Sequence, residues 1–112
     1  MDSTVSFRKI KNSCEEVCLI LKSLSHPQRL LILGHLLEGS KTVGELVERC
    51  DASQSQMSQF LTRMKLEGLV NSEKDGRYQV YSLADMRLVP LMSTIQTQYC
   101  IDYLMARTNC RK

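Results

Sequence analysis

The sequence has no tryptophan and few other aromatic residues, with only two phenylalanines and four tyrosines among its 112 residues. Leucine, isoleucine, valine and methionine must therefore fill any core, and at 43% hydrophobic residues the chain can build one small domain. No apolar run approaches the about 20 residues needed to span a membrane, and the N-terminal stretch "MDSTVSFRKIKNSCEE" lacks the apolar centre of a secretion signal. We therefore expect one cytoplasmic domain without a membrane partner.

Features that enzymes need are also missing. The chain has no pair of carboxylates near a histidine, no glycine-rich loop for phosphate and no nucleophile elbow. We therefore predict that the protein is not an enzyme, and nothing in its composition indicates a cofactor.

Neither the charge nor the cysteine content identifies a partner. The net charge is only +3, and acids and bases balance between residues 41 and 79, so an argument for nucleic acid must rest on where the charges lie. Five cysteines, an odd number without a secretion signal, make a disulfide framework a poor interpretation. Buried thiols, metal ligands and redox sensors remain as alternatives.

Hydrophobic periodicity predicts two helices at the start of the chain. The first covers about residues 8–24, where apolar residues recur at three- and four-residue steps and form one stripe. The stretch "SHPQRLLILGHLLEG" predicts the second, with Ser25 as N-cap, Pro27 in the first turn and Gly39 ending it in a left-handed conformation. Leucines nearly encircle this segment, so we expect it to be the buried central helix.

Capping residues mark two further helices. In "KTVGELVERC", Thr42 and Glu45 have the spacing of a capping box, which predicts a short third helix. A fourth helix is expected over about residues 54–67, capped by Ser53 and stopped by Gly68.

The segment after Gly68 changes to strand chemistry. Tyrosine and valine favour strand, and Asp75-Gly76 is a strong signal for a type I′ turn. We therefore predict a hairpin of residues 69–73 and 78–83.

A last helix begins near Leu88 and runs to about residue 107, with Pro90 in its first turn, where proline is tolerated. The domain boundaries that follow are a flexible N-terminus (1–7), a single domain (8–107) and a frayed C-terminal tail (108–112). The order of elements predicts a mainly α fold with a β-hairpin wing, a winged helix-turn-helix, whose fourth helix enters the major groove of DNA.

The fourth helix has two chemically different sides. Met57, Phe60, Leu61 and Met64 cluster on one side at about 100° per residue and would hold the helix against the core. Amides and hydroxyls occupy the other side, and glutamine can bond adenine while serine and threonine can serve base edges or phosphates. We predict that this face and the wing bind double-stranded DNA through Ser53, Gln54, Ser55, Gln56, Ser58, Gln59, Thr62, Arg63, Lys74 and Arg77.

Two alternatives compete with DNA binding. The fourth helix alone is compatible with an ordinary solvated helix, and some winged helices bind only proteins. A protein-binding version should expose hydrophobic or acidic residues, whereas Ser55, Gln59 and Thr62 stand on this face. The capped short helix before it and the hairpin after it therefore favour DNA.

The pieces "LKSLSHPQRLLIL", "TVGEL", "SQSQMSQFLTRMKLEGLV" and "DGRYQVYSL" together resemble the ArsR/SmtB family of bacterial winged-helix repressors. The resemblance covers residues 21–83 closely, and the flanking helices fit in position and length. It implies a homodimer formed by the first and last helices, binding to a pseudo-palindromic operator, and release of that operator by an inducer.

Inducer sites of the family match this sequence poorly. One family site for lead, cadmium or arsenic uses a cysteine pair on the third helix, but "GELVERCDAS" contains Cys50 alone, which we interpret as packing. Another binds zinc through Asp, His and Glu on the last helix, and residues 84–112 contain no histidine. We interpret His26 and His35 as structural.

The nearest resemblance is to the thiol-sensing subgroup of HlyU, BigR and SqrR. Cys100 in "TQYC" matches one of its two cysteines, whereas Gly34 stands where the subgroup has the other. Cys14 and Cys18 lie on adjacent turns of the first helix and are candidate replacements. Three alternatives stay open: an oxidant or reactive-sulfur switch, a soft metal or metalloid site of Cys14, Cys18 and Cys100, and no cysteine switch at all.

Overall fold

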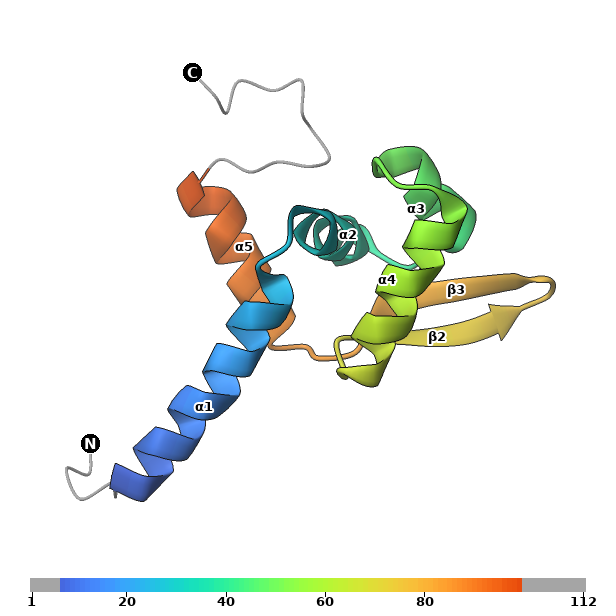
Figure 1. The fold of residues 1–112 in the computed structure, drawn as a ribbon. Coiled ribbons are helices and arrows are strands. Elements are labelled where there is room, and N and C mark those ends of the chain that lie inside the picture. Colours follow the sequence, from blue (N-terminus) through green and yellow to red (C-terminus); the bar gives the residue numbers. More distant parts are fainter. Residues whose placement is uncertain (1–6, 100–112) are drawn as a thin grey trace.

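Five helices and a three-stranded sheet make up residues 7–99, the part of the chain that this computed structural model describes (Figure 1). The elements are α1 (Phe7–Leu24), α2 (Pro27–Glu38), β1 (Lys41–Thr42), α3 (Val43–Arg49), α4 (Gln54–Leu66), β2 (Val70–Asp75), β3 (Tyr78–Leu83) and α5 (Leu88–Tyr99). The predicted winged helix-turn-helix order is confirmed, with β1 as an addition. None of the helices in this part of the chain is long and apolar enough to cross a membrane.

The central helix α2 joins the two halves of the domain. In Figure 1 it lies between α1 and α5 on one side and α3, α4 and the hairpin on the other. Its residues from Ile32 to Leu36 are buried, as the encircling leucines predicted. Buried side chains from every helix and from β2 complete a single core: Leu24, Ile32, Leu33, Leu36, Leu46, Cys50, Met57, Leu61, Met64, Leu69, Val70, Leu88 and Met92.

The strand β1 escaped prediction because its two residues carry no periodic pattern of their own. It pairs antiparallel with β3, Lys41 opposite Tyr81, so the sheet order is β1-β3-β2. Lys41 is only 8% exposed, and its Nζ donates to the Gly39 carbonyl at 3.3 Å and lies 3.5 Å from Glu38 Oε1. Pairing with β3 ties the start of α3 to the wing.

The wing is longer than predicted, and its turn lies one residue further along. Asp75 pairs with Tyr78 and belongs to β2, so Gly76 and Arg77 form the turn. Gly76 has a φ of 65°, the positive value that a tight hairpin needs. The predicted Asp75-Gly76 turn is therefore wrong by one position, and Arg77 stands at the tip itself.

The N-cap of α2 also differs from the prediction. The ring Nδ1 of His26 accepts from the Gln28 N–H at 3.1 Å and caps the helix, whereas the Ser25 hydroxyl donates to the Lys22 carbonyl at 2.8 Å and closes the end of α1. Gly39 ends α2 with φ 150° and ψ 177°, an extended conformation open essentially to glycine rather than the predicted left-handed helical one.

The helix α1 begins at Phe7, a residue assigned to the N-terminus by the sequence, and it extends away from the body (Figure 1). Only Leu24 of this helix is buried, while Ile10, Val17 and Leu21 of the predicted stripe are 47%, 49% and 51% exposed. These side chains therefore stay about half exposed to solvent in the single chain and are not covered by its own core.

The helix α5 is described to Tyr99. Its first two turns pack on the core through Leu88 and Met92, whereas Tyr99 is exposed. The predicted continuation to residue 107 and the tail (108–112) lie outside the described residues.

Candidate nucleic-acid interface

The helix α4 is fixed by one side and by both ends. Met57, Leu61 and Met64 are fully buried, and Phe60 packs partly buried against the core. At the N-terminus, Ser53 Oγ accepts from the Gln56 N–H at 3.1 Å, and Gln56 Oε1 accepts from the Ser53 N–H at 2.9 Å. This reciprocal capping box satisfies two backbone donors and confirms Ser53 as the N-cap.

The opposite side of α4 is exposed and carries neither an acid nor a large apolar side chain from Gln54 to Arg63. Ser55, Ser58, Gln59 and Thr62 all lie on this surface, as their spacing predicted. Amide and hydroxyl groups on such a surface can both donate and accept hydrogen bonds, which is the chemistry that base edges in a major groove require.

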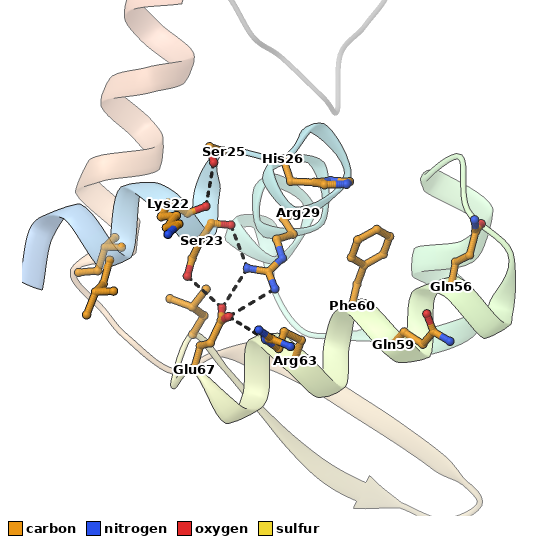
Figure 2. A pocket seen from close by; sticks show the side chains of 13 residues that line it. Lys22, Ser23, Ser25, His26, Arg29, Gln56, Gln59, Phe60, Arg63 and Glu67 are labelled. Carbon is orange, nitrogen blue, oxygen red and sulfur yellow. Dashed lines mark hydrogen bonds and ion pairs between the residues drawn. The ribbon is translucent and has the colours of Figure 1, made fainter.

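Arg63 is held differently from the other predicted residues. Its Nε donates to Glu67 Oε2 at 3.2 Å, although the side chain is 69% exposed. Figure 2 shows Arg63 and Glu67 at one end of α4, with Gln59 and Gln56 successive turns away. The positive charge of Arg63 is therefore paired with the carboxylate of Glu67, one helical turn further along the chain.

Glu67 is a residue that the sequence did not single out. Burial works against its charged form, but hydrogen bonds from Arg29, Ser23 and Arg63 outweigh it, so the pKa of the Glu67 carboxyl lies below its usual range. Arg29 Nη1 lies 2.9 Å from Glu67 Oε1. No periodic signal marks this cluster, because its members come from α1, α2 and the end of α4.

The wing carries the other predicted cations. Lys74 and Arg77 are exposed, Arg77 in the turn and Lys74 opposite Gln79 in the hairpin ladder. Lys65, which was not predicted, joins α4 to the wing by donating from Nζ to Ser72 Oγ at 2.7 Å. Basic side chains thus occur on both α4 and the hairpin, where Glu73 and Asp75 balance Lys74 and Arg77.

The cysteines fall into two environments. Cys50 is 7% exposed at the end of α3, and burial raises the pKa of its thiol to about 11, so it is an unreactive packing residue as predicted. Cys14 and Cys18 are exposed on α1 in the single chain. Cys100 lies outside the described residues.

The described residues do not form a metal site. Among residues 7–99, no three His, Cys, Asp or Glu side chains gather closely enough to hold an ion. His35 is buried in α2, where burial and then the charge of Arg49 lower the pKa of its imidazole, and Gly34 beside it is buried too. His26 caps α2, and its ring lies 5.1 Å from that of Phe60. Both histidines are structural, as predicted.

Comparison with known proteins identifies this arrangement. The profile of the family described as "Bacterial regulatory protein, arsR family" matches residues 26–72. The HTH-type transcriptional regulator YgaV of Escherichia coli (strain K12) is 37% identical over 94 residues, which span 82% of this chain and 94% of YgaV. The chain belongs to the ArsR family. It is therefore a DNA-binding transcriptional regulator, and the prediction that it is not an enzyme is confirmed by its relatives.

Two further proteins match over most of their length. The transcriptional activator HlyU of Vibrio cholerae is 37% identical over 90 residues, spanning 80% of this chain and 82% of HlyU. Its reduced form superposes with a TM-score of 0.79 at 29% identity, covering 85% of this chain and all of that one. A homodimeric winged helix-turn-helix DNA-binding domain from Mycobacterium bovis superposes with a TM-score of 0.70 at 26% identity, covering 87% and 89%.

Proposed function

We propose that this ArsR-family protein is a homodimeric repressor whose exposed α4 surface reads a pseudo-palindromic operator, and that a thiol-directed signal releases it. DNA binding is supported chiefly by one observation, that α4 has one buried side and one exposed side. Its buried Met57, Leu61 and Met64 leave the helix no freedom to rotate, so Ser55, Gln59 and Thr62 must face outward. An unpaired amide and two hydroxyls suit base edges.

The individual contacts follow from side-chain chemistry. Gln59 lies at the middle of α4 and is suited to bidentate bonding with adenine N6 and N7. Ser55, Ser58 and Thr62 are short and suit either base edges or phosphates. Lys74 and Arg77 on the wing suit phosphates or the adjacent minor groove, which would fix the register without reading sequence. Ser53, Gln54, Gln56 and Arg63 border this surface, and three of them, Ser53, Gln56 and Arg63, already use part of their bonding capacity locally.

The dimer is supported by α1. Ile10, Val17 and Leu21 form an apolar stripe about half exposed in the single chain, and a helix that exposes such a stripe is expected to bury it against a partner. The homodimeric Mycobacterium bovis domain has the same fold. A two-fold axis through α1 and α5 would place two α4 helices on successive major grooves, about 34–36 Å apart.

The signal is proposed to act on thiols of the same interface. Cys14 and Cys18 are exposed on α1, four residues apart, and Cys100 is the residue after Tyr99 in the sequence. Oxidation would remove two electrons and two protons from a pair of these thiols and form one S–S bond, with the oxidant or polysulfide as acceptor. A bond across α1 and α5 would change the angle between subunits and so the separation of the α4 helices.

The proposal is tested by DNA binding under four conditions. The protein selects its own operator from a random duplex library, and gel shifts are then run with reductant, diamide, polysulfide and arsenite, with mass spectrometry of the thiols. For a bond between Cys18 and Cys100, we expect release by diamide or polysulfide in the wild type and none in Cys18→Ser or Cys100→Ser. The control is Cys110→Ser, which changes a cysteine outside the proposed set and should show normal release. Release by arsenite alone would instead support a metalloid site of Cys14, Cys18 and Cys100. Binding unchanged in all four conditions would leave a regulator without a cysteine switch.

A further inference from the structure

The C-terminal end of α4 carries an acid where helix electrostatics disfavour one. Glu67 is the C-cap residue, and the carbonyl end of a helix bears partial negative charge that repels a carboxylate. The side chain is also only 28% exposed, so it has lost much of its contact with water. A carboxylate in this position needs compensation from other parts of the chain.

That compensation comes from three elements. Arg29, in the first turn of α2, places Nη1 2.9 Å from Glu67 Oε1 and Nη2 3.4 Å from Oε2, a two-pronged contact. The Ser23 hydroxyl, near the end of α1, donates to Glu67 Oε1 at 3.0 Å. Arg29 Nη1 also donates to the Ser23 carbonyl at 3.1 Å. With Arg63, these residues form a closed cluster, which we call the Glu67 network (Figure 2).

The Glu67 network borders an open cleft. A hollow of about 930 Å³ lies between the end of α1, the start of α2 and one flank of α4, and all four residues of the network line it. The apolar residues that line this cleft, Leu19, Ile20, Phe60 and Leu69, leave it open, so apolar packing does not close the space between α1 and α4 along this flank. The polar contacts of Glu67 bridge it, and Figure 2 shows them at the α1 end, away from Gln56 and Gln59.

We propose that the Glu67 network sets the angle of α4 relative to α1, and thereby the spacing of operator half-sites that the dimer accepts. This inference rests on the proposed dimer, in which α1 belongs to the subunit interface. A rotation at the junction of α1 and α2 moves the whole DNA-reading unit, so a contact that fixes the junction also fixes the distance between the two α4 helices. Glu67 is thus a positioning residue that does not touch DNA.

Half-site spacing separates this role from simple stabilisation. An ion pair that only stabilises the fold changes affinity for every operator alike. A contact that fixes geometry changes the ratio of affinities between operators of different spacing. Inserting one base pair rotates the half-sites by about 35° relative to each other, so a rigid dimer discriminates strongly against it.

The experiment measures that ratio by gel shift on the selected operator and on the same duplex with one base pair inserted at its centre. In the wild type, the affinity for the selected operator should greatly exceed the affinity for the duplex with the inserted base pair. We expect Glu67→Gln to reduce this ratio of affinities by about 3- to 30-fold, the usual effect of a coupling residue. The same variant also frees Arg63 to contact a phosphate, but this would raise the affinities for both duplexes by the same factor and leave their ratio unchanged. Ser23→Ala, which removes one donor and leaves the ion pair, should narrow the ratio less and is the second variant if Glu67→Gln does not fold.

Glu16→Gln is the matched control. Glu16 lies on α1 and pairs with Arg87 at 3.4 Å, so the variant also removes an acid that links α1 to another segment, but one that does not reach α4. It should keep the wild-type ratio. A wild-type ratio in both Glu67→Gln and Ser23→Ala would overturn the inference and leave the proposed function intact. A wild-type protein that selects a single half-site would overturn the two-fold operator, and the spacing role with it.

Discussion

At the scale of single residues, the side chains that we propose for DNA contact differ in how many of their hydrogen-bonding groups are already used within the chain. The side-chain oxygens of Ser53 and Gln56 accept the hydrogen bonds that cap α4, and the guanidinium of Arg63 donates a hydrogen bond to Glu67. Gln59 and Thr62 have no such local role in the described structure. Sequence discrimination is therefore expected to depend more on Gln59 than on the flanking polar residues.

Changing Gln59 to Ala should remove the preference for one base pair in each half-site. A bidentate amide–adenine contact contributes about 1–3 kcal/mol of discrimination, or about 5- to 150-fold in relative affinity. Competition binding with single-base operator variants measures it. Gln98→Ala, the same change on the exposed end of α5, is the control. An unaltered ranking of operator variants in Gln59→Ala would remove this residue from base readout.

Changing Arg77 to Ala should weaken binding to all duplexes about equally. Arg77 stands in the turn of the wing, where a guanidinium can neutralise one phosphate without contacting a base. Loss of one phosphate contact lowers the slope of log affinity against log salt by about 0.9. Arg87→Ala is the control, because Arg87 is bound to Asp85 at 2.7 Å and to Glu16. A slope equal to that of the wild type would exclude a phosphate contact by the wing tip.

At the scale of elements, local signals predicted the fold well wherever they act over three or four residues. The capping boxes of Thr42 and Ser53 place the starts of α3 and α4 as expected. Contacts between distant segments were missed, since they leave no pattern in one sequence. Pairing with β3 creates β1, and the carboxylate of Glu67 meets an arginine that lies 38 residues away. The predicted DNA-contact residues depended on local signals, helical periodicity for α4 and a turn signal for the wing, whereas the Glu67 network joins segments that are far apart in the sequence.

The capping role of Ser53 can be separated from its predicted role at DNA. Ser53→Ala removes the acceptor for the Gln56 N–H and should lower the free energy of unfolding by about 1 kcal/mol. Ser53→Asp keeps an acceptor and should retain wild-type stability, while its negative charge should weaken DNA binding. Urea unfolding and gel shifts on both variants measure the two effects. Wild-type affinity in Ser53→Asp would show that this position lies away from phosphates.

The lowered pKa of Glu67 makes the junction of α1, α2 and α4 sensitive to acid. A carboxyl whose pKa is depressed on folding stabilises the protein above its unfolded value of about 4.5, and this contribution disappears as the pH falls through the folded value. The wild type should therefore be more stable than Glu67→Gln at about pH 7, and the difference should shrink at about pH 3. Urea unfolding at both pH values measures it. A difference that does not change with pH would show that the charge of Glu67 is not what stabilises the junction.

At the scale of the whole molecule, the described chain is divided between the part that we propose reads DNA and a part whose apolar surface is incompletely covered. Figure 1 shows α3, α4 and the wing on one side of α2, with α1 and α5 on the other. The Glu67 network joins the two sides at one end of α4. A signal acting on α1 or α5 would therefore reach α4 through α2 and this junction, which is why the proposed thiol switch and the spacing role concern the same region.

The apolar stripe of α1 gives the sharpest test of the proposed dimer. Val17 lies on the stripe and is 49% exposed in the single chain, so Val17→Asp should leave the fold of the chain intact. A carboxylate there would be buried against the partner, which costs several kcal/mol without a compensating charge, and the dimer should dissociate. Asn12→Asp adds the same charge on the opposite side of α1 and should remain dimeric. Sedimentation equilibrium compares the two variants, and circular dichroism checks that both are folded. Because a monomer can engage only one half-site, Val17→Asp should also lose the preference for paired half-sites, whereas a dimeric Val17→Asp would move the subunit interface away from α1.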